Sequence, residues 1–156
     1  SVEGLDICIV GGRGILKRPT PWQFKNVPNI VERYSQLKLK LKNLLKECSN
    51  PKILVTHYAT TFETVVGEPE SIFDYLGYPL VEELNSAEKP VVAIHGHAHR
   101  SKVTHRLVNG VEVYNVALPA NGGVKIVELR IDNKGIDGVG EIKGKTLMDF
   151  VRIKQR

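Results

Sequence analysis

Four short runs of apolar and β-branched residues predict strands in this chain. They lie at 5–10 ("LDICIV"), 52–56 ("KILVT"), 90–94 ("PVVAI") and 124–131 ("VKIVELRI"). Glycine or proline precedes or begins each run, as is typical of strand ends. The run at 90–94 has no polar position, which favours a strand buried on both faces of a sheet.

A helix is predicted after residue 29, where the apolar period changes from two to between three and four. Its apolar stripe consists of Ile30, Tyr34, Leu37, Leu41, Leu45 and Cys48. We expect Asn29 to cap this helix, because Glu32 follows at the spacing of a capping box. The segment "LKLKLK" (37–42) also suits a strand, but the longer register favours a helix. A second, short helix is predicted over 80–88.

The remaining segments predict turns and loops. Asn109-Gly110 lies between two alternating segments, "VTHRLV" and "VEVYNVAL", and predicts a β-hairpin. Asn133 and Gly135 predict a further turn, and the tail at 146–156 is a last strand or a loose basic end. "LKRPTPWQF" (16–24) is interpreted as a loop, and 57–79 as a long loop of the kind that covers functional sites. The order β, α, β, α, β, then antiparallel β, predicts a layered α/β sandwich with a mixed sheet.

Composition places the chain among single-domain globular proteins. It has 156 residues, of which 42% are hydrophobic and 25% charged, and a formal net charge of +5. No apolar run is long enough for a membrane span and no leader begins the chain, so we expect no membrane partner and a cytoplasmic location. The positive charge suits a phosphate-bearing partner and leaves nucleic acid open. Cys8 and Cys48 are expected to be buried, reduced thiols of a reducing compartment.

Histidine is concentrated in one stretch, "AIHGHAHRS" (93–101). His95, His97 and His99 alternate there, so they point to one side if the segment is extended. Gly96 permits a sharp turn that would break this alternation. His57 follows another predicted strand, and ligands gather outside the carboxyl ends of parallel strands. Imidazoles without thiols favour Mn, Zn, Fe, Co or Ni as the metal.

The other candidates have open roles. His95 is a ligand, a residue that orients a ligand, or a packed residue, whereas His105 lies inside the predicted hairpin and is interpreted as an ordinary strand residue. Arg13 and Arg100 are cations suited to the non-bridging oxygens of a phosphate, and surface arginines are an equal interpretation. Tyr58 lines a substrate pocket or belongs to the core.

The motif Gly96-His97-Ala98-His99 after a buried strand, with His57 in "ILVTHYA", resembles the calcineurin-like metallophosphoesterases. The resemblance runs from about Leu5 to Ile131 and includes the hairpin and "VYNVALPANGG". It implies a metallophosphoesterase-like α/β sandwich, with mixed β-sheets flanked by helices. It also implies that His57 and His97 bind one of two divalent metal ions and that His99 binds the other. A metal-bound hydroxide would then hydrolyse a phosphomonoester or phosphodiester.

The family's amino-terminal motifs Asp-x-His, Gly-Asp-x-x-Asp and Gly-Asn-His do not occur in the 156 residues. Two divalent cations that share a site need an anionic bridge, which three imidazoles do not provide. We therefore interpret the chain as the carboxy-terminal portion of one phosphoesterase domain, with its amino-terminal part missing or on a partner chain. The start at Ser1 fits this interpretation. A non-catalytic, protein-binding scaffold of the same fold and a site for a single metal are the alternatives.

Overall fold

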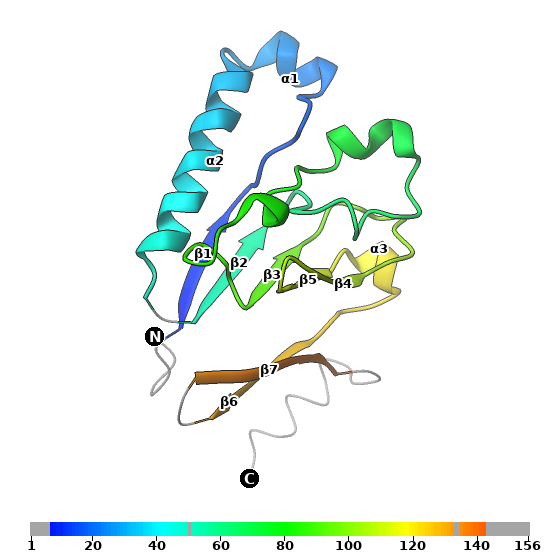
Figure 1. Cartoon of the computed structure of the whole chain (residues 1–156). Helices are drawn as coiled ribbons and strands as arrows, with labels where there is room; N and C mark the ends of the chain where they lie inside the picture. Colours follow the sequence, from blue (N-terminus) through cyan, green and yellow to red (C-terminus); the bar gives the residue numbers. More distant parts are fainter. Residues whose placement is uncertain (1–6, 50, 133–134, 143–156) are drawn as a thin grey trace, which may run out of the picture.

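A five-stranded mixed sheet forms the centre of the computed structural model, which describes residues 7–49, 51–132 and 135–142 (Figure 1). The strand order is β1-β2-β3-β5-β4, and all neighbours are parallel except the β4–β5 hairpin. The strands are β1 (Cys8–Gly12), β2 (Lys52–Thr56), β3 (Val92–His95), β4 (His105–Val108) and β5 (Val111–Asn115). The expected α/β class with a mixed sheet is confirmed at this level.

The helices and a second small sheet complete the described chain. The α-helices are α1 (Pro21–Asn26), α2 (Ile30–Glu47) and α3 (Leu118–Asn121), and 3₁₀ turns lie at Glu70–Tyr75 and Val81–Glu83. An antiparallel pair, β6 (Val127–Asp132) and β7 (Gly135–Glu141), forms the second sheet. No helix in these residues is long and apolar enough to cross a membrane.

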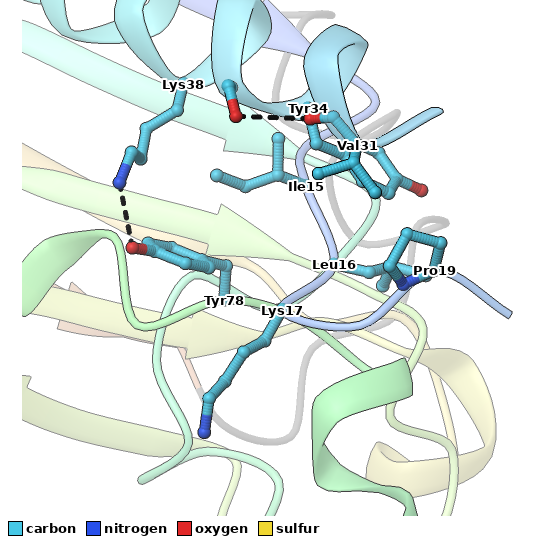
Figure 2. A pocket seen from close by; sticks show the side chains of 9 residues that line it. Ile15, Leu16, Lys17, Pro19, Val31, Tyr34, Lys38 and Tyr78 are labelled. Atoms are coloured by element: carbon cyan, nitrogen blue, oxygen red, sulfur yellow. Dashed lines mark hydrogen bonds between the residues drawn. The ribbon is translucent and has the colours of Figure 1, made fainter. Parts of the chain in front are cut away.

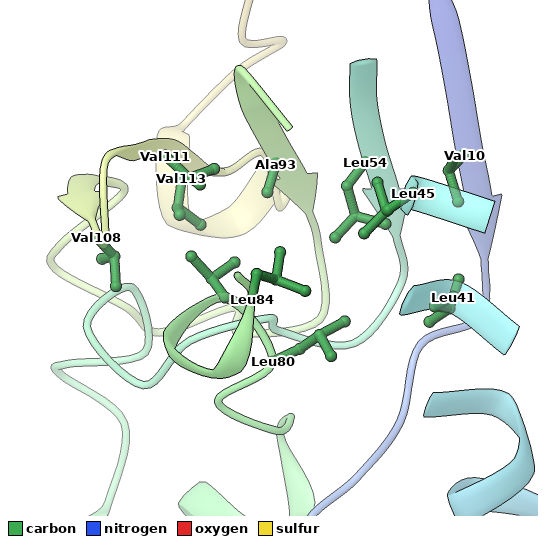
Figure 3. Close-up of a cluster of buried hydrophobic side chains, with 11 residues drawn as sticks. Val10, Leu41, Leu45, Leu54, Leu80, Leu84, Ala93, Val108, Val111 and Val113 are labelled. Carbon is green, nitrogen blue, oxygen red and sulfur yellow. The ribbon is translucent and has the colours of Figure 1, made fainter. Parts of the chain in front are cut away.

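The main core lies between α2 and one face of the sheet (Figure 3). Val10, Leu54, Ala93 and Val113 stand opposite one another in the strand register and form an apolar row across four strands. Leucines of α2 and of the segment after the 3₁₀ turn at 70–75 pack on this row. The buried cluster comprises Val10, Leu41, Leu45, Leu54, Leu80, Val81, Leu84, Ala93, Val108, Val111 and Val113. The period-two strands and the apolar helix stripe therefore meet as the sequence predicts.

The capping prediction was wrong about its position. Asn29 does precede α2, but its φ is 53° and its side chain makes no capping hydrogen bond. A capping box forms instead at Thr20 and Gln23, in the segment interpreted as a loop. Thr20 Oγ1 accepts from the Gln23 amide at 3.2 Å, and Gln23 Oε1 accepts from the Thr20 amide at 2.8 Å. Pro21 opens α1, where its fixed φ suits the first helical position.

Other predicted elements differ in extent. The Asn109-Gly110 hairpin is confirmed, with φ of 49° and 78° at its two central residues. The helix predicted over 80–88 is only the short 3₁₀ turn at Val81–Glu83, and the strand predicted over 124–131 is Val127–Asp132. Asn133 and the tail at 146–156 lie outside the described residues.

The prediction of free thiols was wrong, because Cys8 and Cys48 form a disulfide. Cys48 follows the last residue of α2 and Cys8 begins β1, and the packing of α2 on the sheet brings their Cα atoms to 6.1 Å. That separation lies within the range that a disulfide spans. The two cysteines therefore give no argument for a reducing compartment.

The face of β1 and β2 opposite α2 carries exposed apolar side chains. Ile9 is 68% exposed and Val55 is 39% exposed, and both alternate with residues that point into the core. Parallel sheets in soluble proteins are normally covered on both faces. The described residues thus cover one face of these two strands and leave the other, which we call the open face, in contact with solvent.

The core between α2 and the sheet can be tested with two leucines of that helix. Leu45 is fully buried and Leu39 is 62% exposed. We expect Leu45→Ala to lower the free energy of unfolding by about 2–5 kcal/mol, because it leaves a cavity beside Leu54. Leu39→Ala should change it by less than about 0.5 kcal/mol. Urea denaturation followed by circular dichroism measures both, and equal losses would contradict this packing.

Candidate functional site

The candidate residues lie where three parallel strands end. Gly12, Thr56 and His95 are aligned in the register of β1, β2 and β3, so the chain leaves all three strands at one edge of the sheet. Arg13 and His57 come directly after β1 and β2. Backbone hydrogen bonds join the three segments that follow these strands. The Tyr58 amide donates to the Arg13 carbonyl at 3.0 Å, and the Gly96 amide donates to the His57 carbonyl at 3.2 Å.

This edge brings two of the three predicted metal ligands together. The imidazole rings of His57 and His97 have centroids 4.8 Å apart and are tilted by 57°. The ring of Tyr58 contacts both, with centroids at 5.3 Å from His57 and 4.9 Å from His97. The guanidinium of Arg13 lies 5.4 Å from the centroid of the Tyr58 ring. Arg13, His57, Tyr58 and His97 therefore form one cluster, which we call the histidine edge.

His99 does not join this pair. Its side chain is exposed, as is that of the neighbouring Arg100, whose amide donates to Glu68 Oε1 at 2.7 Å. Among residues 7–49, 51–132 and 135–142, no three side chains of His, Cys, Asp or Glu come close enough together to hold a metal. The described chain thus supplies two converging imidazoles, but no third His, Cys, Asp or Glu side chain close enough to complete a metal site with them.

The backbone at His97 explains why the histidines diverge. His97 has a φ of 68°, in the left-handed region, so the turn that Gly96 permitted is centred one residue later. The Ala98 amide donates to the Gly96 carbonyl at 2.8 Å, which closes a three-residue γ-turn centred on His97. Such a conformation costs on the order of 1 kcal/mol for a residue with a side chain, and strain of this kind is concentrated at functional sites. The turn removes the extended alternation that would align His97 with His99.

His97 is poised as a neutral imidazole. Burial and then the nearby His57 lower its pKa below the ordinary 6.5, and His99 adds a smaller lowering, while a hydrogen bond to the Tyr75 backbone and the charge of Glu68 oppose the shift. The side chain is half-buried, so it is still open to the edge of the sheet. A neutral imidazole offers a nitrogen lone pair, which is the form that binds a metal ion.

The other two histidines have structural surroundings. His95 is completely buried at the end of β3, where Nδ1 lies 2.8 Å from the Gly96 carbonyl and Nε2 lies 2.6 Å from Thr64 Oγ1. This position excludes it as a ligand at the surface of the edge. His105 lies on β4, stacks on Tyr114 with centroids 4.3 Å apart, and bonds to Glu112. It is a strand residue, as we expected.

A polar chain behind Tyr58 could not be read from the sequence. Gln23 Nε2 donates to the Tyr34 hydroxyl at 3.0 Å and lies 3.4 Å from that of Tyr58. Burial, reinforced by the neighbouring Tyr58, raises the pKa of Tyr34 to about 12, so the Tyr34 ring presents a neutral hydroxyl at this contact. These residues come from α1, α2 and the exit of β2. Only the capping-box spacing of Thr20 and Gln23 hinted at an ordered segment there.

A separate pocket of about 120 Å³ lies between α2 and the segment before α1 (Figure 2). Lys38 Nζ donates to the Tyr78 hydroxyl at 2.9 Å across it. Its lining is otherwise mainly apolar and consists of Ile15, Leu16, Lys17, Pro19, Val31, Tyr34, Ser35, Lys38 and Tyr78. No residue of the histidine edge lines this pocket, so it is not part of the candidate site.

Comparisons with known proteins do not identify a relative. No family model matches the chain, and no curated protein or solved structure matches it significantly.

Burial of His95 gives a testable pH dependence. Its pKa falls from the ordinary 6.5 to about 4 in the folded chain, mainly because burial disfavours the charged ring. Below pH 6.5 the unfolded chain takes up this proton and the folded chain does not, so His95 lowers stability progressively between pH 6.5 and about 4. A shift of this size corresponds to roughly 3 kcal/mol. Urea denaturation at several pH values should show a steeper loss for the wild type than for His95→Gln; equal slopes would contradict the burial of a neutral ring.

Proposed function

We propose that this chain carries the histidine part of a metal-dependent phosphoesterase site that hydrolyses phosphomonoesters or phosphodiesters. The observation that carries the proposal is the convergence of His57 and His97, one of them on a strained turn, at the carboxyl edge of a parallel sheet. Ligand sites in open α/β sheets lie at such edges. The Gly-His-x-His motif and the strand-end histidine add the resemblance to calcineurin-like phosphoesterases.

Each residue of the edge has a proposed role. His57 and His97 would hold one of two divalent metal ions through their imidazole nitrogens. Mn, Zn, Fe, Ni and Co are the candidate metals. The metal ions would polarise the phosphoryl group and lower the pKa of water. Arg13 would neutralise a non-bridging phosphate oxygen, and the buried Tyr58 ring supports both Arg13 and His97. From the neighbouring exposed segment, His99 would bind the second metal ion and Arg100 would contact a phosphate oxygen.

The remaining ligands would come from polypeptide outside the described residues. Two imidazoles do not hold a pair of divalent ions, and no carboxylate lies in a group with them among the residues that the structure describes. The open face supports such an addition, because Val55 of that face is two residues from His57 and Gly11 is two residues from Arg13. A β-segment on this face, from an upstream part of the protein or from a partner chain, would end beside the histidine edge.

A protein-binding scaffold of the same fold is the second candidate. It is favoured by the same exposed side chains of Ile9 and Val55, which a binding partner would cover, and by the incomplete ligand set. The two candidates differ in chemistry: a scaffold needs no metal, whereas a phosphoesterase site binds metal through His57 and His97.

Metal retention by histidine variants tests the proposal. After dialysis against Mn²⁺ or Co²⁺, His57→Ala and His97→Ala should each lower bound metal, with affinity falling at least about tenfold, since each removes an imidazole ligand. His105→Ala is the matched control, because His105 is a half-exposed histidine of β4 outside the edge. Elemental analysis measures metal per chain. Equal retention by all variants would overturn the site.

Hydrolysis of an aryl phosphate and an aryl phosphodiester separates the remaining alternatives. The chain alone, with Mn²⁺ or Ni²⁺ added, should turn over slowly or not at all, and restoring the upstream segment of the reading frame should raise the rate. Rapid turnover by the chain alone would place the acidic ligand within this sequence or in a second copy. No turnover with the upstream segment restored would favour the scaffold.

A further inference from the structure

Three neighbouring strands end in buried polar side chains. Thr56, His95 and Asn115 are aligned in the register of β2, β3 and β5 and point to the face that carries the core. Thr56 is 6% exposed, and His95 and Asn115 are fully buried. Each occupies the last inward position of its strand, and the preceding inward residue, Leu54, Ala93 or Val113, is apolar. Burying a polar group is costly unless it is hydrogen-bonded, so their partners indicate their role.

His95 bonds to the turn that carries His97 and to the long segment after β2. Because a carbonyl can only accept, Nδ1 must donate to the Gly96 oxygen, and Nε2 then accepts from the hydroxyl of Thr64. Thr64 is also fully buried. The neutral ring therefore joins two segments that are 31 residues apart in the sequence.

Asn115 holds the other side of the same turn. Its Nδ2 donates to the Ala98 carbonyl at 2.8 Å and lies 3.4 Å from the Thr64 carbonyl, while its Oδ1 accepts from the Ala117 amide at 3.0 Å. Both polar atoms of the side chain are thus used. Thr64 is held twice, through its hydroxyl by His95 and through its carbonyl by Asn115.

These bonds bracket His97. The carbonyl before it, on Gly96, is bonded to His95 and to the Ala98 amide, and the carbonyl after it, on Ala98, is bonded to Asn115. A left-handed conformation at a residue with a side chain persists only where the surroundings fix it. The hydrogen bonds to the Gly96 and Ala98 carbonyls supply this constraint, and they set the direction in which the His97 imidazole points.

We propose that His95, Thr64 and Asn115 are positioning residues that hold the γ-turn at His97 so that its imidazole faces His57. They act through the backbone of residues 96–98, since all three are fully buried below the edge. This proposal rests on the proposed function for its metal-binding consequence, but the orientation of His97 is testable without metal.

Two threonines of the same segment provide a matched experiment. Thr64 donates to His95, whereas the equally buried Thr60 has an Oγ1 with no hydrogen-bond partner in the described part of the chain. Thr64→Val should weaken binding of Co²⁺ by about 10–100-fold, the usual effect of removing a group that orients a ligand. Thr64→Ser should restore binding, and Thr60→Val should leave it unchanged. Isothermal titration with Co²⁺ alone, on protein shown to be folded, measures all four affinities.

A metal-free measurement keeps the two proposals distinguishable. In ¹H–¹⁵N spectra of the imidazoles, Thr64→Val should shift the His97 resonances more than Thr60→Val does. If Thr64→Val lowers only the free energy of unfolding, with His97 resonances and Co²⁺ affinity unchanged, the positioning role is overturned. If the wild type binds no Co²⁺ while the His97 resonances move as expected, the proposed function fails and the positioning of the turn stands.

Discussion

Parallel hydrogen bonding of β1, β2, β3 and β5 in one register is the constraint on which the candidate site depends. Parallel strands point their carboxyl ends the same way, so the residues that follow them meet at one edge. In this chain those residues include Arg13 and His57, and the turn after β3 adds His97. The apolar row that packs on α2 fixes this register, because a slip of one residue would turn each strand's core side chains outward.

The same sheet links the site to what lies beyond the described residues. One face is covered by α2, and the open face carries the exposed Ile9 and Val55. The histidine edge is also chemically incomplete, since no third His, Cys, Asp or Glu side chain of the described residues completes a metal site with the two imidazoles. An additional β-segment would cover the open face and would supply the missing ligands, because β1 and β2 of that face end next to Arg13 and His57.

Much of this arrangement could be predicted from local patterns, and the rest depends on contacts between distant segments. Apolar periods identified the strands and α2, and the strand-end rule brought His57 and His97 together. The sequence only permitted a sharp turn, at Gly96, whereas the γ-turn is centred on His97 and His99 is exposed. The bonds that hold this turn come from Thr64 and Asn115, 31 and 17 residues distant from their partners, and no local pattern indicates them. The disulfide was missed for the same reason.

The central claim is that a metal ion binds between His57 and His97, and a crystal of the chain grown or soaked with Mn²⁺ or Co²⁺ tests it most directly. Data collected at the absorption edge of that metal locate the ion without reference to any assumed site. The account predicts an anomalous difference peak within coordination distance of both imidazoles, beside Tyr58. A well-ordered histidine edge with no peak, or a peak held only by other residues, would contradict it.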